Sequence, residues 1–386
     1  MSAAHTDLAR HRTNRLVSLV KHGLRFIGVA QIEGMDGEIR TTAVDFSFGE
    51  LLNLHKDKEI IIRPEYQRLF RWSIEQRSRL IESILMGLPI PPIFLIENDD
   101  GVLELIDGLQ RTSSVLQFLD HEAINQPELV LDGCDFLKGL QGKTFNTLET
   151  VLRLKVKRSP IRATIINKSG DSFVKYELFK RLNTGGSLLS AQEIRNCSSR
   201  MVDGGGVFYD TIQSLATFSA FVKATSRLPD SMIEQRANEE LVLRFFALLA
   251  ARDKFKGNIE EWLDGFMEDI LFKRVSFDVA AQAVNFERTF DIIYTKFGDQ
   301  AFTRFNSHGE ATGRLAPAYF EAVCAAVAAN HDALSKLDGG VLIERLRRAF
   351  ESENFKQATG PGANTIPKLH QRIATVAGYL LNNDAT

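Results

Sequence analysis

The sequence is short of several features that would restrict its function at once. Its 386 residues include three cysteines, Cys134, Cys197 and Cys324, which are far apart and form no Cys-x-x-Cys pair. We therefore expect reduced, buried thiols rather than a disulfide framework or a zinc cluster. No apolar run approaches the roughly 18 residues that a membrane helix needs. The short run from Leu16 to Val20 is interrupted by Lys21, so we expect no secretory signal, no membrane contact and a cytoplasmic location.

An excess of positive charge is also missing. The 47 Lys and Arg residues are balanced by 49 Asp and Glu residues, for a net charge of -2. This balance excludes a generally basic nucleic-acid coat, so any contact with DNA must come from a local patch. The length and the 44% of hydrophobic residues are typical of a globular chain with two domains.

Several catalytic signatures are absent too. There is no Gly-x-x-x-x-Gly-Lys-Ser/Thr loop, no His-Glu-x-x-His pair and no Gly-x-Ser-x-Gly elbow. Any chemistry must therefore use carboxylate, amide and guanidinium groups.

The elements that are present predict an α+β fold followed by an all-α region. We expect an N-terminal extension with a short amphipathic helix over 1–44, a mixed domain over 45–203 and a helical domain over 204–386. In the mixed domain we expect the following elements: a helix capped by Asp45 and running to Leu54, a helix capped by Ser73 and stopped by Gly87, a hairpin of strands 93–97 and 102–106, a strand pair over 152–166 broken near Ser159, and a Ser190–Glu193 capping box.

The most informative stretch joins a strand to a helix at Asp107-Gly108-Leu109-Gln110-Arg111, with Thr112 next. A helix start offers free N–H groups and the positive end of its dipole, and an arginine can grip phosphate. Asp107 could hold a metal ion or orient a water. The alternative is that Asp107 is only a helix cap, with Arg111 as its ion-pair partner.

Two arginine-rich stretches are candidates for contacts with nucleic acid. Between Arg63 and Arg79 five arginines, among them Arg71 and Arg77, alternate with aromatic residues, a pattern suited to bases and phosphates. Arg153, Lys155 and Lys157 alternate, so on a strand they would share one face. In both cases a solvated surface is the alternative.

Taken together, three motifs resemble the GmrSD-type N-terminal domain family of prokaryotes. They are a Pro64–Trp72 segment followed by a Leu80–Leu85 helix, the Ile106–Arg111 box, and the Arg181–Gly186 loop ahead of Glu193-Ile194-Arg195. The family implies a ParB/sulfiredoxin-like fold whose box binds a nucleoside triphosphate, with Mg²⁺ as a candidate metal. By position, Asp107, Gly108, Gln110, Arg111 and Thr112 would form the nucleotide box. The residues expected to complete this pocket are Tyr66, Gln67, Arg68, Asn183, Thr184 and Gly185.

The sequence departs from the family pattern at Leu109, where glutamine is usual. An amide that might orient water is lost, so hydrolysis by Asp107, Gln110 and Arg111 is less secure than binding. Leu109 also replaces the cysteine of sulfiredoxin, which excludes sulfinic acid reduction. No histidine lies in a constellation typical of an HNH nuclease, so any cutting of DNA would come from a partner subunit or from the mixed domain by another arrangement of residues.

Three functions remain open on the sequence alone. The first is a bacterial anti-phage restriction component that binds, and as an NTPase would hydrolyse, a nucleoside triphosphate. The second is a DNA-binding or nicking factor, and the third is a non-catalytic nucleotide sensor or scaffold. The sequence leaves the formation of a homo-oligomer open.

Overall fold

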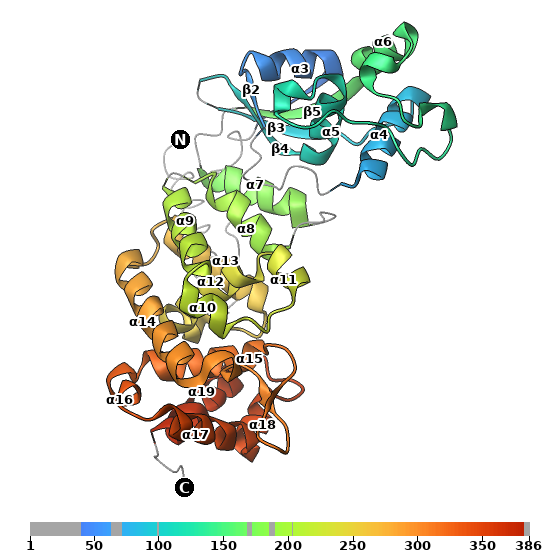
Figure 1. Ribbon diagram of the computed structural model, residues 1–386. Helices are drawn as coiled ribbons and strands as arrows, with labels where there is room; N and C mark the ends of the chain where they lie inside the picture. The colour runs from blue at the N-terminus through green and yellow to red at the C-terminus, as the bar shows by residue number, and fades with distance from the viewer. Residues whose placement is uncertain are drawn as a thin grey trace, which may run out of the picture.

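A computed structural model of the chain describes residues 40–62, 72–98, 100–167, 172–184, 190–202 and 204–381. The strands of the larger sheet and helices α3 to α6 form a lobe at one end of an elongated molecule (Figure 1). Helices α7 to α19 form the rest. A mixed N-terminal α+β region followed by a helical region is therefore confirmed.

The sheet of the α+β lobe has five strands in the order β1-β5-β3-β4-β2. Its strands are β1 (Arg40–Ser47), β2 (Ile60–Ile61), β3 (Ile93–Glu97), β4 (Leu103–Asp107) and β5 (Pro160–Asn167). β3 pairs antiparallel with β4 and parallel with β5, while β2 is parallel to β4 and β1 antiparallel to β5. The predicted hairpin is thus confirmed as β3–β4.

Each face of the sheet is buried by a different set of helices, because successive side chains of a strand point to opposite faces. Leu95 and Leu105 join one hydrophobic core, whereas the neighbouring Ile96 and Ile106 join another. The first core is shared with α3 (Phe48–Lys56), α4 (Ile74–Met86), α5 (Leu109–Leu119) and α6 (Thr150–Arg158). The second is shared with α7 (Ser172–Thr184) and α8 (Ala191–Ser199).

The predicted helix boundaries of α4 and α8 are confirmed by their caps. The Ser73 hydroxyl accepts from the Gln76 N–H while the Gln76 side chain accepts from the Ser73 N–H. α4 ends at Gly87, whose φ of 76° is left-handed and suits glycine. Ser190 and Glu193 form the same reciprocal arrangement at the start of α8.

Two predictions in this lobe were wrong. Asp45 lies within β1 and pairs with Arg162 at 2.9 Å, and the cap of α3 is Ser47. Residues 150–158 form helix α6, so only the second half of the expected strand pair exists, as β5. Arg153, Lys155 and Lys157 alternate with apolar residues, which is the spacing of a strand. The residues that pack inward, Leu152 and Val156, are four apart, which is the spacing of a helix.

The helical region is built from α9 to α19. Their bounds are α9 (Gly205–Ala216), α10 (Ser219–Ala224), α11 (Asp230–Glu234), α12 (Ala237–Ala250), α13 (Ile259–Leu271), α14 (Val279–Phe297), α15 (Pro317–Ala328), α16 (His331–Ser335), α17 (Gly339–Glu351), α18 (Glu353–Thr359) and α19 (Ile366–Leu380). A small hairpin of β6 (Arg304–Phe305) and β7 (Ala311–Thr312) interrupts them. The large core of this region begins with Tyr176 of α7, so α7 and α8 contact both parts of the molecule.

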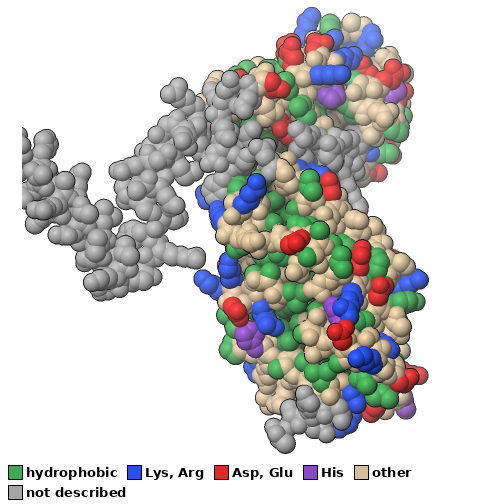
Figure 2. All heavy atoms as spheres, turned by 90° about the vertical axis from the view of Figure 1, so that its left-hand side faces the viewer, with side chains coloured by type: hydrophobic (Ala, Val, Ile, Leu, Met, Phe, Trp, Pro, Cys, Tyr) green, Lys and Arg blue, Asp and Glu red, His purple; other side chains and the backbone are tan. Residues whose placement is uncertain are grey.

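The surface in Figure 2 shows how side chains are distributed on one side. Hydrophobic side chains gather over the middle of the helical region, and basic and acidic side chains are interspersed on the α+β lobe. Among the described residues, none of the helices combines the length and the apolar character required to cross a membrane.

Candidate functional site

The junction of β4 and α5 lies at the end of a buried strand and begins a buried helix. β4 ends at Asp107, and Gly108 is the N-cap of α5 with a left-handed φ of 97°. Within the described ranges no side chain caps this helix, whereas serines cap α3, α4 and α8. The first helical hydrogen bond is from the Thr112 N–H to the Gly108 carbonyl, so the preceding N–H groups are left for another acceptor.

Gly108 is required here for two reasons. A left-handed φ is costly for a residue with a side chain. A Cβ atom at this position would also lie 2.4 Å from Cγ2 of Ile93 and 3.2 Å from Nη2 of Arg111. The glycine therefore lets the backbone pass close to β3 and to the arginine.

Arg111 and Asp107 converge at the start of α5. Arg111 Nη2 donates to Asp107 Oδ2 at 3.1 Å and to the carbonyl of Pro92 at 2.9 Å. Its Nη1 has no acceptor among the described residues, and its buried Nε has none either. The Asp107 side chain is one third exposed and that of Arg111 about one fifth, so the pair is reached by solvent. An anion could therefore reach Nη1 without breaking the ion pair.

This geometry separates the two sequence interpretations of Asp107. The ion pair with Arg111 exists, but Asp107 is not the helix cap. Leu109 is 6% exposed and belongs to the core that the sheet shares with α3 to α6, and Thr112 is fully buried. Of the box, Asp107, Gln110 and Arg111 are the residues with partly exposed side chains.

Two residues of the arginine-rich stretch, Trp72 and Arg77, contact α5. The backbone N–H of Trp72 donates to Gln110 Oε1 at 3.3 Å, and Arg77 Nη1 donates to Gln117 Oε1 at 2.8 Å. Two of the three predicted motifs therefore meet on α5. The other residues predicted from this motif, Tyr66, Gln67, Arg68 and Arg71, lie outside the described residues.

The residues of the third motif, Arg181–Gly186 and Glu193–Arg195, lie at the end of α7 and in α8. Asn183 and Thr184 are the last residues of α7, and Gly185 lies outside the described part of the chain. The Glu193 carboxylate caps α8, and Arg195 is buried at 2% exposure. Arg195 Nε donates to Asp264 Oδ1 on α13 at 2.7 Å, so this motif residue attaches α8 to the helical region.

The predicted nucleic-acid residues of the second cluster lie on helix α6, not on a strand. On a helix that turns about 100° per residue, Arg153, Lys155 and Lys157 do not share one face. With Arg158 they spread over an arc of about 200° around the outward side. Among the described residues no carboxylate lies within ion-pair distance of these four cations.

A buried carboxylate in the first motif has a role that the sequence did not indicate. Glu82 is 2% exposed and accepts hydrogen bonds from the N–H groups of Asp135, Phe136 and Leu137. Burial opposes ionisation, but these three donors outweigh it and lower the pKa of Glu82. The signal that could have revealed it is an acid placed beside the apolar stripe of α4.

Asp107 is the residue predicted to bind a metal ion. In the described ranges no group of three or more His, Cys, Asp or Glu side chains is arranged to hold a metal. Asp107 could supply one carboxylate to a metal ion whose other ligands came from a bound phosphate and water, as Mg²⁺ commonly does.

Comparison with known proteins gives one match. Residues 48–199 match the family described as the GmrSD restriction endonuclease, N-terminal domain. Neither the curated proteins nor the solved structures contain a significant match. The matched segment runs from the first residue of α3 to the last residue of α8, and so includes the β4–α5 junction and both layers of helices on the sheet. This match to residues 48–199 supports the resemblance of the three sequence motifs to the GmrSD restriction endonuclease N-terminal domain.

Proposed function

We propose that the chain is a nucleoside-triphosphate-binding component of an anti-phage restriction system, with its site at the start of α5. The observation that carries the proposal is that, among the described residues, Arg111 Nη1 has no acceptor and no side chain caps the adjacent helix N-terminus. A phosphate group fits both features, since it accepts from backbone N–H groups and from guanidinium.

The neighbouring groups would then have distinct tasks. Asp107 keeps Arg111 in place through Oδ2, and its Oδ1 has no donor among the described residues. That oxygen could bind a Mg²⁺ ion carried by the nucleotide. Gln110, held by the N–H of Trp72, joins the arginine-rich motif to the site.

Hydrolysis is a separate question from binding. Leu109 is buried in the core, so it presents no group that could orient a water molecule. A sensor that binds nucleotide without turnover is therefore the alternative to an NTPase, with DNA cleavage supplied by a partner subunit. Phosphate release measured with and without DNA distinguishes the two.

The binding proposal is tested by calorimetric titration of the full chain with ATP, GTP, CTP and UTP in the presence of magnesium. Arg111→Ala should weaken binding at least tenfold, because a charge-assisted hydrogen bond contributes about 1.5–3 kcal/mol. Arg162→Ala is the control, since Arg162 forms an exposed ion pair on the same lobe. Equal affinity of the wild-type chain and Arg111→Ala would refute the proposal.

A second function, DNA binding through α6, is favoured by the four cations that lack acidic partners. Phosphate contacts release counterions, so binding to duplex DNA should weaken steeply as salt increases. Replacing Lys155, Lys157 and Arg158 by Gln should reduce both the affinity and the salt slope in fluorescence anisotropy. A matched triple variant at the exposed Lys223, Lys256 and Lys336 should not. If both triple variants behave alike, α6 is not the DNA surface.

A further inference from the structure

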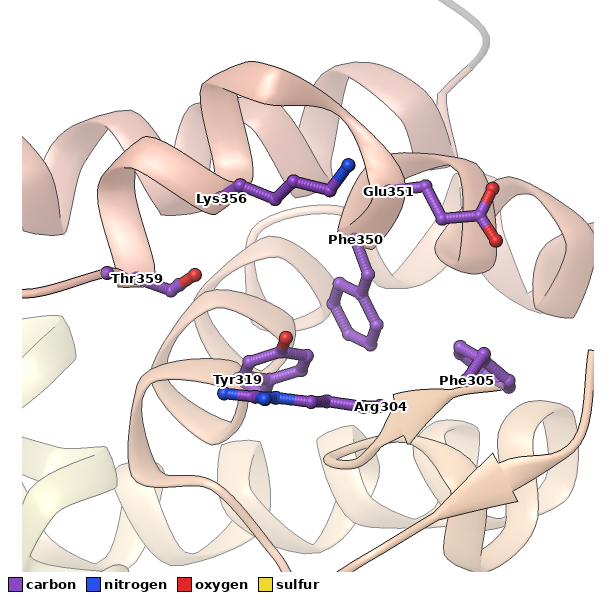
Figure 3. A pocket seen from close by; sticks show the side chains of 8 residues that line it. Arg304, Phe305, Tyr319, Phe350, Glu351, Lys356 and Thr359 are labelled. Atoms are coloured by element: carbon purple, nitrogen blue, oxygen red, sulfur yellow. The ribbon is translucent and has the colours of Figure 1, made fainter. Parts of the chain in front are cut away.

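A pocket lies in the helical region, far along the chain from the β4–α5 junction. It is a cavity of about 320 Å³ between the small hairpin and helices α15, α17 and α18. The residues that line it are Arg304, Phe305, Tyr319, Phe350, Glu351, Lys356, Thr359 and Gly360 (Figure 3). The volume is at the lower end of the range for small-molecule sites.

Tyr319 is the central observation. Its side chain is only 8% exposed, yet its hydroxyl has no hydrogen-bond partner among the described residues. A buried tyrosine hydroxyl usually has such a partner. In Figure 3 the hydroxyl points into the space between Thr359 and Lys356. The ring of Tyr319 is therefore buried while its hydroxyl opens into the cavity, where a ligand could accept a hydrogen bond from it.

The position of this hydroxyl is fixed by the rings around it. Tyr319 packs edge-to-face against Phe350 at 4.5 Å and against Phe355 at 4.9 Å between ring centroids. Phe305 lies 6.1 Å from Phe350. The aromatic rings give the pocket an apolar side on which a planar group could pack.

The charges around the pocket favour an anion. Arg304 has no carboxylate within ion-pair distance among the described residues, and its side chain extends toward Tyr319 (Figure 3). Lys356 makes only an exposed, 3.4 Å pair with Glu353. The one acid in the lining, Glu351, is paired with Arg347 at 2.9 Å and points away from Tyr319. The Thr359 hydroxyl donates to the Phe355 carbonyl, so it can only accept from a ligand.

We propose that this pocket binds a small aromatic anion, a planar ring that carries a phosphate or a carboxylate. The ring packs against Phe350 and Phe305. The anionic group accepts hydrogen bonds from the Tyr319 hydroxyl and from the cationic groups of Arg304 and Lys356. The cavity volume fits a mononucleotide or a smaller molecule. Because its lining residues all belong to the helical region, this site is separate from the triphosphate site proposed on α5.

The test uses AMP as the phosphate probe and indole-3-carboxylate as the carboxylate probe, each titrated into the full chain by calorimetry. All titrations are repeated in the Arg111→Ala variant, in which binding at α5 is weakened, so that an affinity unchanged by this substitution is assigned to the pocket in the helical region. Binding of either probe supports the proposal, and the stronger of the two identifies the source of the anionic group. If neither binds, the proposal is overturned.

Variants then locate the binding. Tyr319→Phe removes only the hydroxyl and keeps the ring, and Arg304→Gln removes only the charge. Each should weaken binding about tenfold, whereas the nearby exposed Arg314→Gln should leave it unchanged. Thermal unfolding confirms that each variant is folded. Affinities unchanged in both Tyr319→Phe and Arg304→Gln would place the ligand elsewhere and refute the proposal.

Discussion

The guanidinium of Arg195 donates through Nε to the carboxylate of Asp264 at 2.7 Å, which joins α8 to α13. Arg195 is 2% exposed and also contacts Gln192, the carbonyl of Glu260 and the carboxylate of Glu240. Glu240 in turn pairs with Arg244 at 2.8 Å. The family motif thus ends in a network of charges that continues into the helical region.

Further buried pairs extend this network. Arg244 binds Glu321 of α15 at 3.0 Å, and Glu321 also binds Arg372 of α19. On the other side, Lys180 of α7 lies 3.0 Å from Asp264. Opposite charges therefore alternate from α7 to α19 without interruption, which fixes the helices relative to one another.

We predict that Arg195→Ala destabilises the chain by about 3 kcal/mol, because it removes the buried cation that Asp264 and Glu240 share and leaves each carboxylate with one cationic partner. The measurement is urea unfolding followed by circular dichroism. Arg347→Ala is the control, since Arg347 pairs with exposed carboxylates on α17 and should cost less than about 1 kcal/mol. Similar losses in the two variants would show that the network adds little.

We predict that Gly108→Ala is more damaging than Gly142→Ala. Both glycines have a left-handed φ, of 97° and 73°, so both substitutions carry backbone strain of about 1–2 kcal/mol. Only at position 108 would the new Cβ collide with Ile93. The difference between the two unfolding free energies therefore reports the close approach of the β4–α5 junction to β3. Equal losses would contradict that packing.

We predict that Glu82 makes the stability depend on pH. The pKa of Glu82 is lower in the folded chain than its ordinary value of about 4.3, because three N–H donors outweigh the effect of burial. A depressed pKa stabilises the fold above the unfolded pKa, and this stabilisation is lost as the pH falls through the folded pKa. Glu82→Gln should therefore be less stable than wild type at pH 7 by about 1–3 kcal/mol, and the gap should narrow below about pH 4.

The control for this experiment is Glu353→Gln, because Glu353 is exposed and forms only a surface pair. Unfolding is measured in urea at a series of pH values. A gap between wild type and Glu82→Gln that stays constant from pH 7 to pH 3 would contradict the role assigned to the carboxylate.

We predict that the three thiols are protected in the folded chain. Cys134, Cys197 and Cys324 are all buried, and none of them forms a disulfide within the part of the chain that the structure describes. Burial raises the pKa of Cys134 and of Cys324, which reduces the reactive thiolate further. Ellman's reagent at pH 8 should react slowly with the native protein and rapidly with three thiols in denaturant. Fast reaction of one thiol under native conditions would reveal local opening.

The sequence by itself determined the local elements that short-range rules govern. Ser73 and Ser190 are the N-caps of their helices and Gly87 is a C-cap, as predicted, because a cap depends on a few neighbouring residues. The hairpin of β3 and β4 and the strand-to-helix junction at Asp107 were also predicted from adjacent residues. The same holds for the family, whose motifs are continuous stretches of chain.

The tertiary structure decided what depends on packing. Residues 150–158 have a pattern compatible with a strand, and only burial of Leu152 and Val156 against the α+β core makes them a helix. The loop contacts of Glu82, the bond between Arg195 and Asp264, and the pocket around Tyr319 each bring together residues that are distant in sequence. Such contacts follow from how the helices pack, which no local pattern of residues encodes.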